Sequence, residues 1–188
     1  MMYSFDIEKL LALFDEYCTQ YVSDKSSGTG HLASEIRTRI KQVDLLTRKV
    51  MECESEITAV LVQELQTKNL KMHEHKVFEM TTTVECCLYI AHRLITTIRS
   101  LTDLGWSDFS CNEISDVRNQ LLAHPREGLF GRSFSWGMPN GPAIKAVRTE
   151  TNKYLLRDKG LYFNVNMMFT RLQERLELLL KHDVPTAT

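Results

Sequence analysis

The fold is organised around residues 77–101, which read VFEMTTTVECCLYIAHRLITTIRSL. Apolar side chains recur in this stretch at alternating intervals of three and four residues. This spacing places them on one face of an α-helix, because one turn takes 3.6 residues. The row consists of Val77, Met80, Val84, Cys87, Ala91, Leu94, Ile98 and Leu101. The stretch therefore predicts a long helix with one buried face.

The preceding residues predict a second long helix, from about residue 31 to 68. Branched apolar residues repeat every seven positions from Ile36 to Ile57, while Thr47 and Glu54 interrupt a second row. Such a helix is about 55 Å long at 1.5 Å per residue. Because only a short break separates the two helices, they are expected to pack antiparallel in a bundle; the alternative is a long coiled coil.

Three further helices are predicted, at residues 5–22, 111–123 and 164–182, and each has an apolar face that must be buried. Residues 23–30 read SDKSSGTG, which is typical of a turn and linker. With 43% hydrophobic and 25% charged residues, the chain has the composition of a soluble globular protein. We expect a single all-α domain over residues 1–188, an up-and-down helical bundle of about five helices.

Residues 126–164 differ from the helical pattern and form an insertion before the last helix. They hold five of the eight glycines and carry a net charge of +4, which leaves −5 for the rest of the chain. Residues 153–157 and 161–165 predict a β-hairpin, and residues 131–142 an ordered loop. Basic residues among aromatics suit single-stranded RNA. The alternative is a solvated hairpin whose aromatics cover the end of the bundle.

The stretch at residues 110–125, SCNEISDVRNQLLAHP, predicts a short helix with reactive side chains, which we call the motif helix. Ser110 and Glu113 have capping-box spacing, and Pro125 ends the helix near residue 123. The apolar stripe of this helix comprises Ile114, Val117 and Leu121.

Arg118 and His124 lie on the two flanks of that stripe. A guanidinium remains charged and matches phosphate oxygens in a fork, whereas an imidazole exchanges protons near neutral pH. The pair therefore suits acid–base chemistry at a phosphate. The alternative is structural: a snorkelling arginine and a core histidine with satisfied hydrogen bonds.

Arg118-Asn119, four residues and His124 resemble the RNxxxxH form of the Arg-x(4 to 6)-His motif of the HEPN superfamily, small helical proteins that include metal-independent endoribonucleases. The resemblance implies a homodimer in which two motif helices share a cleft. It further implies that Arg118 binds the scissile phosphate, His124 acts as general acid or base, and Asn119 orients the pair. The chain departs from one common version of the family, because Arg126 replaces a tyrosine two residues after the histidine.

These features predict a metal-independent endoribonuclease of toxin or phage-defence type that cleaves single-stranded RNA. Its catalytic residues would be Arg118, Asn119 and His124. The RNA-binding residues would be Arg126, Arg132, Arg148 and Arg157. The alternative is a non-catalytic HEPN-like protein that binds a nucleotide, RNA or a protein partner. An antitoxin, if one exists, would be a separate protein.

Other classes of site find little support in the sequence. The five cysteines show no CxxC spacing, and His73 and His75 point to nearly opposite sides of a helix. No glycine arrangement is typical of a phosphate-binding loop. We therefore expect no metal and no cofactor. No apolar run reaches the ~20 residues of a membrane span, and residues 1–6 do not resemble a signal peptide, so a cytoplasmic protein is expected.

Overall fold

The computed structural model describes residues 5–22, 27–67, 72–111, 114–115, 133–136, 144–147, 161–163 and 165–181. Most of these residues are helical, which confirms the all-α prediction. The elements are α1 (Ile7–Tyr21), α2 (Gly28–Thr67), α3 (Met72–Arg99), the 3-10 helix η1 (Thr102–Leu104), β1 (Ser133–Trp136), β2 (Ile144–Val147), β3 (Leu161–Phe163) and α6 (Val165–Lys181).

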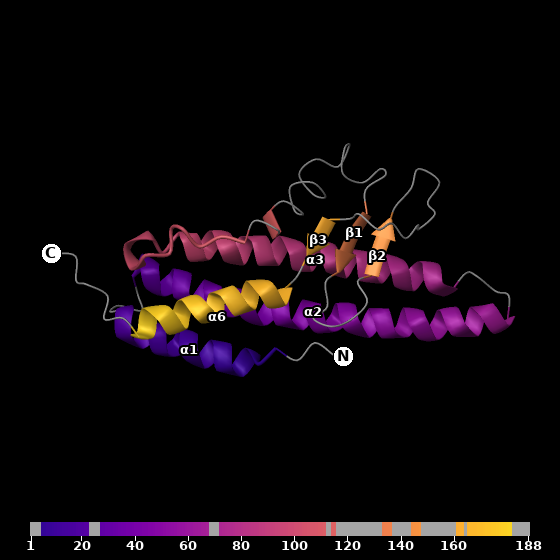
Figure 1. Ribbon diagram of the computed structural model, residues 1–188, viewed down its shortest axis with the longest axis horizontal. Helices are drawn as coiled ribbons and strands as arrows, with labels where there is room; N and C mark the ends of the chain where they lie inside the picture. Colours follow the sequence, from indigo (N-terminus) through magenta and orange to yellow (C-terminus); the bar gives the residue numbers. More distant parts are fainter. Residues whose placement is uncertain are drawn as a thin grey trace.

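Helices α2 and α3 form a long antiparallel hairpin, as predicted (Figure 1). Ion pairs fix this direction: Glu35, early in α2, lies 3.4 Å from Arg93, late in α3. Closer to the hairpin tip, Lys49 Nζ of α2 lies 3.3 Å from Glu79 Oε1 of α3. These pairs are partly exposed and contribute little energy individually, so the hairpin must be held together mainly by its apolar seam.

The predicted apolar row of α3 is that seam. All of its members from Met80 to Leu101 are buried, whereas the side chain of Val77 lies outside the described residues. Thr47 faces this seam from α2 and is only 2% exposed. Its hydroxyl donates to the Val43 carbonyl at 2.7 Å and lies 3.7 Å from Cys87 Sγ. A polar residue is therefore accommodated in the seam because its hydroxyl has partners.

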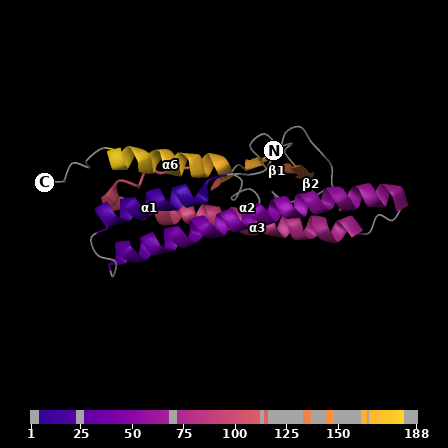
Figure 2. The ribbon, with the colours of Figure 1, turned by 90° about the horizontal axis from the view of Figure 1, so that it is seen from below.

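Helices α1 and α6 lie side by side and cover one half of the hairpin (Figures 1 and 2). Asp6 caps α1, since its carboxylate accepts from the backbone N–H of Lys9 at 3.0 Å. The predicted faces are buried: Leu10, Phe14 and Tyr17 in α1, and Met168, Leu172 and Leu176 in α6. The far half of the hairpin projects beyond both helices (Figure 2).

Helix α2 begins at Gly28, three residues before the predicted start near His31, so the expected linker is shorter than residues 23–30. Ser27 provides the reason. Its hydroxyl accepts from the N–H of Gly30 at 3.1 Å, and its carbonyl accepts from the N–H of His31 at 3.1 Å. The helix therefore starts at Gly28 although its first turn contains two glycines, because Ser27 acts as the N-cap and accepts hydrogen bonds from the backbone of that turn.

A small sheet, ordered β2-β1-β3, lies beside the hairpin beyond the start of α6 (Figures 1 and 2). The loop prediction for residues 131–142 was wrong in part, because β1 forms there and pairs antiparallel with β2. Its alternating Ser-Phe-Ser-Trp sequence is typical of a strand. The strand predicted at residues 161–165 is confirmed in part: β3 covers residues 161–163, Val165 already belongs to α6, and β3 pairs in parallel with β1. Residues 153–157, its predicted partner, lie outside the described residues.

Candidate active site

The structure describes where the motif helix begins. The Cys111 carbonyl accepts from the N–H groups of Ile114 and Ser115, at 3.1 and 3.3 Å, and Ile114 is fully buried as predicted. Cys111 therefore occupies the N-cap position, one residue after the predicted cap, Ser110. The cause is burial: Phe109 and Cys111 both face the core, which leaves Ser110 exposed between them.

The predicted site residues lie outside the described residues. This applies to the proposed catalytic set, to the proposed RNA-binding arginines, and to the Glu113 side chain expected to complete the capping box. The residues concerned are Glu113, Arg118, Asn119, His124, Arg126, Arg132, Arg148 and Arg157. The part of the site with known geometry is thus the chain that leads into the motif helix, residues 101–111, which we call the entry turn.

The entry turn is tightly wound. Leu104 and Trp106 both donate their backbone N–H groups to the Leu101 carbonyl, at 3.2 and 3.3 Å. Gly105 has φ of +75°, a left-handed conformation that glycine adopts without steric cost. Phe109 N–H then donates to the Trp106 carbonyl at 3.0 Å. The path from α3 to the motif helix is therefore fixed by local hydrogen bonds.

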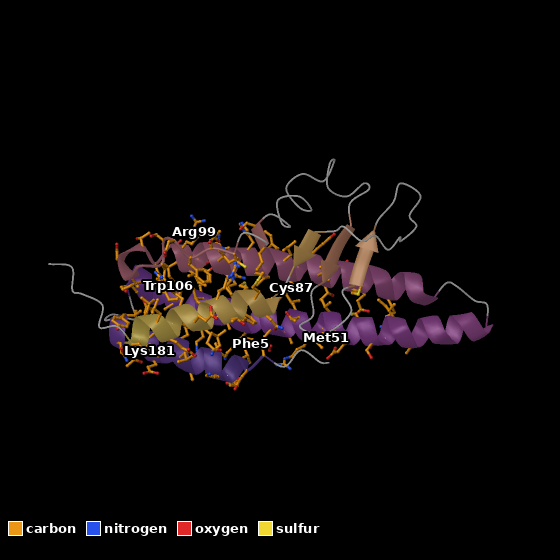
Figure 3. The ribbon with its side chains drawn as sticks, in the orientation of Figure 1. Phe5, Met51, Cys87, Arg99, Trp106 and Lys181 are labelled. Atoms are coloured by element: carbon orange, nitrogen blue, oxygen red, sulfur yellow. The ribbon has the colours of Figure 1, made fainter. Side chains whose placement is uncertain are left out.

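Trp106 anchors the entry turn to α1. Its indole Nε1–H donates to the Tyr17 hydroxyl at 2.8 Å, and that hydroxyl donates to the Leu104 carbonyl at 3.2 Å. The two rings pack edge to face, with centroids 5.6 Å apart. Burial raises the pKa of Tyr17, so its hydroxyl remains protonated and able to donate at neutral pH. Figure 3 shows Trp106 at the same end of the bundle as Lys181 of α6.

Two arginines of α6 hold the entry turn from another side. Arg175 Nη2 donates to the Gly105 carbonyl at 2.8 Å and to Asp108 Oδ1 at 3.2 Å. One turn earlier in the helix, Arg171 Nη1 lies 3.7 Å from Cys111 Sγ. A shallow groove of about 320 Å³ runs between these arginines and Phe109. The start of the motif helix therefore rests on α6.

Sequence reasoning did not identify Arg171 and Arg175. Both lie outside the apolar stripe of α6, where arginines ordinarily point into solvent. Their spacing of four residues places them on one helical face, and this was the available signal. Nothing in the spacing indicated the partner, because Gly105 is 70 residues away in the chain.

The described residues offer no metal site. They contain no group of three or more histidine, cysteine or acidic side chains placed to share a metal ion. Glu79, one helical turn after His75 in the sequence, is paired with two lysines: its carboxylate lies 3.2 Å from Lys76 and 3.3 Å from Lys49. Hydrogen bonds from these lysines lower the pKa of Glu79. The side chains of His73 and His75 lie outside the described residues.

Two thiols are held protonated. Burial raises the pKa of Cys87 to about 12 and that of Cys18 to about 11. Cys18 lines a cavity of about 550 Å³ between α1 and α2, beside the ion pair of Arg37 and Asp15. Because the thiolate is the nucleophilic form, neither cysteine is suited to nucleophilic catalysis at neutral pH.

The buried Cys87 thiol predicts an alkaline loss of stability. An unfolded thiol ionises near pH 8.5, well below the folded pKa of about 12. The contribution of this thiol to the stability of the fold is therefore complete below about pH 8.5, and it is lost as the pH rises towards 12. We expect the free energy of unfolding in urea to fall by roughly 1 kcal/mol per pH unit between about pH 9 and 11 on account of this thiol. Cys87→Ala should flatten that slope; an unchanged slope would contradict the prediction.

Comparisons of the chain with protein-family models, with curated proteins and with solved structures find no match. Within the described ranges, even the longest helices contain no stretch that is both long and apolar enough to cross a membrane. The functional interpretation therefore depends on the residues of the chain itself.

Proposed function

We propose that the chain is a HEPN-like helical protein that cleaves single-stranded RNA without a metal ion, as a toxin or defence factor. The observation that carries the proposal is the RNxxxxH motif, Arg118-Asn119 to His124, in the sequence of a protein whose described part is an all-α bundle. The anchored entry turn supports it, because a catalytic pair needs a rigid support. Proton transfer and phosphate binding are the two functions that metal-independent cleavage requires, and the motif contains a group for each.

The proposed reaction uses the RNA's own 2′-hydroxyl as nucleophile. His124 takes the hydroxyl proton, and the 2′-oxygen attacks the adjacent phosphorus. The bond to the 5′-oxygen breaks, and that oxygen receives a proton from a protonated imidazole. The products are a 2′,3′-cyclic phosphate and a 5′-hydroxyl. Arg118 stabilises the negative charge that develops on the phosphate, and Asn119 orients the pair.

RNA binding is assigned to the basic insertion, through Arg126, Arg132, Arg148 and Arg157. The strand register supports a joint role for two of these residues. Arg132 directly precedes Ser133 and Arg148 directly follows Val147, and Ser133 and Val147 are register partners in the sheet. Phosphate contacts of this kind set affinity and make it dependent on salt.

The proposal includes a homodimer in which two motif helices border one cleft. Each subunit would contribute one imidazole and one guanidinium, so that one histidine acts as base and the other as acid. A separate antitoxin protein is a further possible partner. Light scattering at micromolar concentration tests the dimer directly, and a monomer would count against it.

We expect purified protein to cleave single-stranded RNA equally well in EDTA and in magnesium. DNA should be spared because it lacks the 2′-hydroxyl. The measurement is gel analysis of end-labelled oligonucleotides, with enzymatic tests of the termini for a 2′,3′-cyclic phosphate and a 5′-hydroxyl. Cleavage that requires magnesium, or that leaves a 5′-phosphate, would contradict the mechanism.

A second candidate function is a non-catalytic HEPN-like protein that binds a nucleotide, RNA or a protein partner. The observation that favours it is Arg126, which occupies the position of a tyrosine found in one common version of the family. The same assay separates the two proposals: salt-sensitive RNA binding without any cleavage would support this second function.

A further inference from the structure

We propose that Arg175 is a positioning residue, which sets the orientation of the motif helix by holding the entry turn against α6. The catalytic consequence of this role rests on the function proposed above. The guanidinium makes two contacts with the turn through Nη2, to the Gly105 carbonyl at 2.8 Å and to Asp108 Oδ1 at 3.2 Å. It thereby bridges both ends of the four residues 105–108.

The entry turn transmits the position of Gly105 to the motif helix because it has little freedom of its own. Trp106 is 1% exposed, and its indole N–H donates a hydrogen bond to the Tyr17 hydroxyl. The backbone N–H of Phe109 donates a hydrogen bond to the Trp106 carbonyl. Cys111, also 1% exposed, then accepts the first hydrogen bonds of the motif helix. A shift of Gly105 therefore moves a packed unit that ends at the helix cap.

The surroundings of Arg175 indicate that its contacts contribute more to the geometry of the entry turn than to the stability of the fold. Its Nε–H is buried and has no hydrogen-bond partner among the residues that the structure describes, which is unfavourable for folding. Its ion pair with Asp108 contributes little energy, because the Asp108 side chain is 71% exposed to solvent. Arg171, one turn away, contacts Cys111 at the other end of the turn. Helix α6 thus contacts the middle and the C-terminal end of the entry turn with guanidinium groups.

The test compares Arg175→Met with a matched arginine elsewhere. Methionine keeps much of the apolar stem and removes every donor. The control is Arg37→Met, since Arg37 also binds an aspartate, Asp15, at 2.8 and 2.9 Å, but joins α1 to α2 far from the entry turn in the chain. We expect Arg175→Met to lower kcat for RNA cleavage by about tenfold to a hundredfold, with little change in KM, because small misplacements of catalytic groups are costly. Arg37→Met should leave kcat unchanged.

A second measurement does not depend on activity. Hydrogen exchange at the amides of Ile114 and Ser115 reports whether the first turn of the motif helix is held in place. Exchange there should be faster in Arg175→Met than in Arg37→Met, and Arg175→Lys should restore part of both the exchange protection and kcat by donating to the Gly105 carbonyl. Should Arg175→Met fail to fold, Arg175→Lys supplies the comparison with wild type.

The outcomes separate this inference from the proposed function. If wild-type protein cleaves RNA and Arg175→Met has the same kcat, the positioning role is overturned while the nuclease stands. If wild-type protein does not cleave RNA, the proposed nuclease fails, and hydrogen exchange alone decides the role of Arg175. Unchanged exchange at Ile114 and Ser115 would then overturn it, and faster exchange would support it.

Discussion

Replacing His124 with alanine is expected to lower the rate of RNA cleavage on the order of a thousandfold, because the variant loses the proposed general acid and base. The melting temperature should change by no more than about 2 °C, since the proposed site places His124 in an open cleft, where a side chain contributes little to packing. Single-turnover cleavage of a labelled oligonucleotide and thermal unfolding measure the two quantities.

A matched control for this variant is His31→Ala. His31 is exposed in the second turn of α2 and belongs to no proposed site, so its replacement should leave cleavage unchanged. Cleavage that persists in His124→Ala would contradict the catalytic assignment. A large fall in melting temperature would instead identify His124 as a buried core residue and favour the structural alternative for the motif.

The helices were predictable because burial follows from local spacing. In α3, alternation of three and four residues identified the buried face from Met80 to Leu101, and the structure confirms it. The start of α2 was harder to predict, because glycines at 28 and 30 suggested a linker while one serine hydroxyl decides the cap. Similarly, strand β1 was missed because its short alternating pattern lies close to glycines and prolines.

Contacts between distant segments were not predictable from spacing. The hydrogen bond between Trp106 and Tyr17 joins residues that are 89 positions apart in the chain. No sequence pattern at either residue indicates that the other is its partner. The same holds for Arg175 and the entry turn. Periodicity specifies which face of a helix is buried, whereas partner choice depends on how the helices are arranged in three dimensions.

Trp106 should be among the residues most important for stability. It is 1% exposed, packs edge to face with Tyr17 and against Phe109, and donates the hydrogen bond that links the entry turn to α1. Alanine would remove these contacts and leave a cavity in a region fixed on several sides. We therefore expect Trp106→Ala to lower the free energy of unfolding by about 3–5 kcal/mol, measured by urea denaturation.

Two further variants show whether this loss of stability arises from the contacts of Trp106 with α1. Trp106→Phe keeps a ring but loses the bond to the Tyr17 hydroxyl, so it should cost about 1–2 kcal/mol, less than alanine. Leu45→Ala, at a side chain that is 66% exposed, should change stability by less than about 0.5 kcal/mol. If Trp106→Ala were as mild as Leu45→Ala, the entry turn would not be anchored through α1. The position of the motif helix would then depend on the arginines that contact the entry turn, which are Arg99 of α3 at the Ser107 carbonyl and Arg171 and Arg175 of α6.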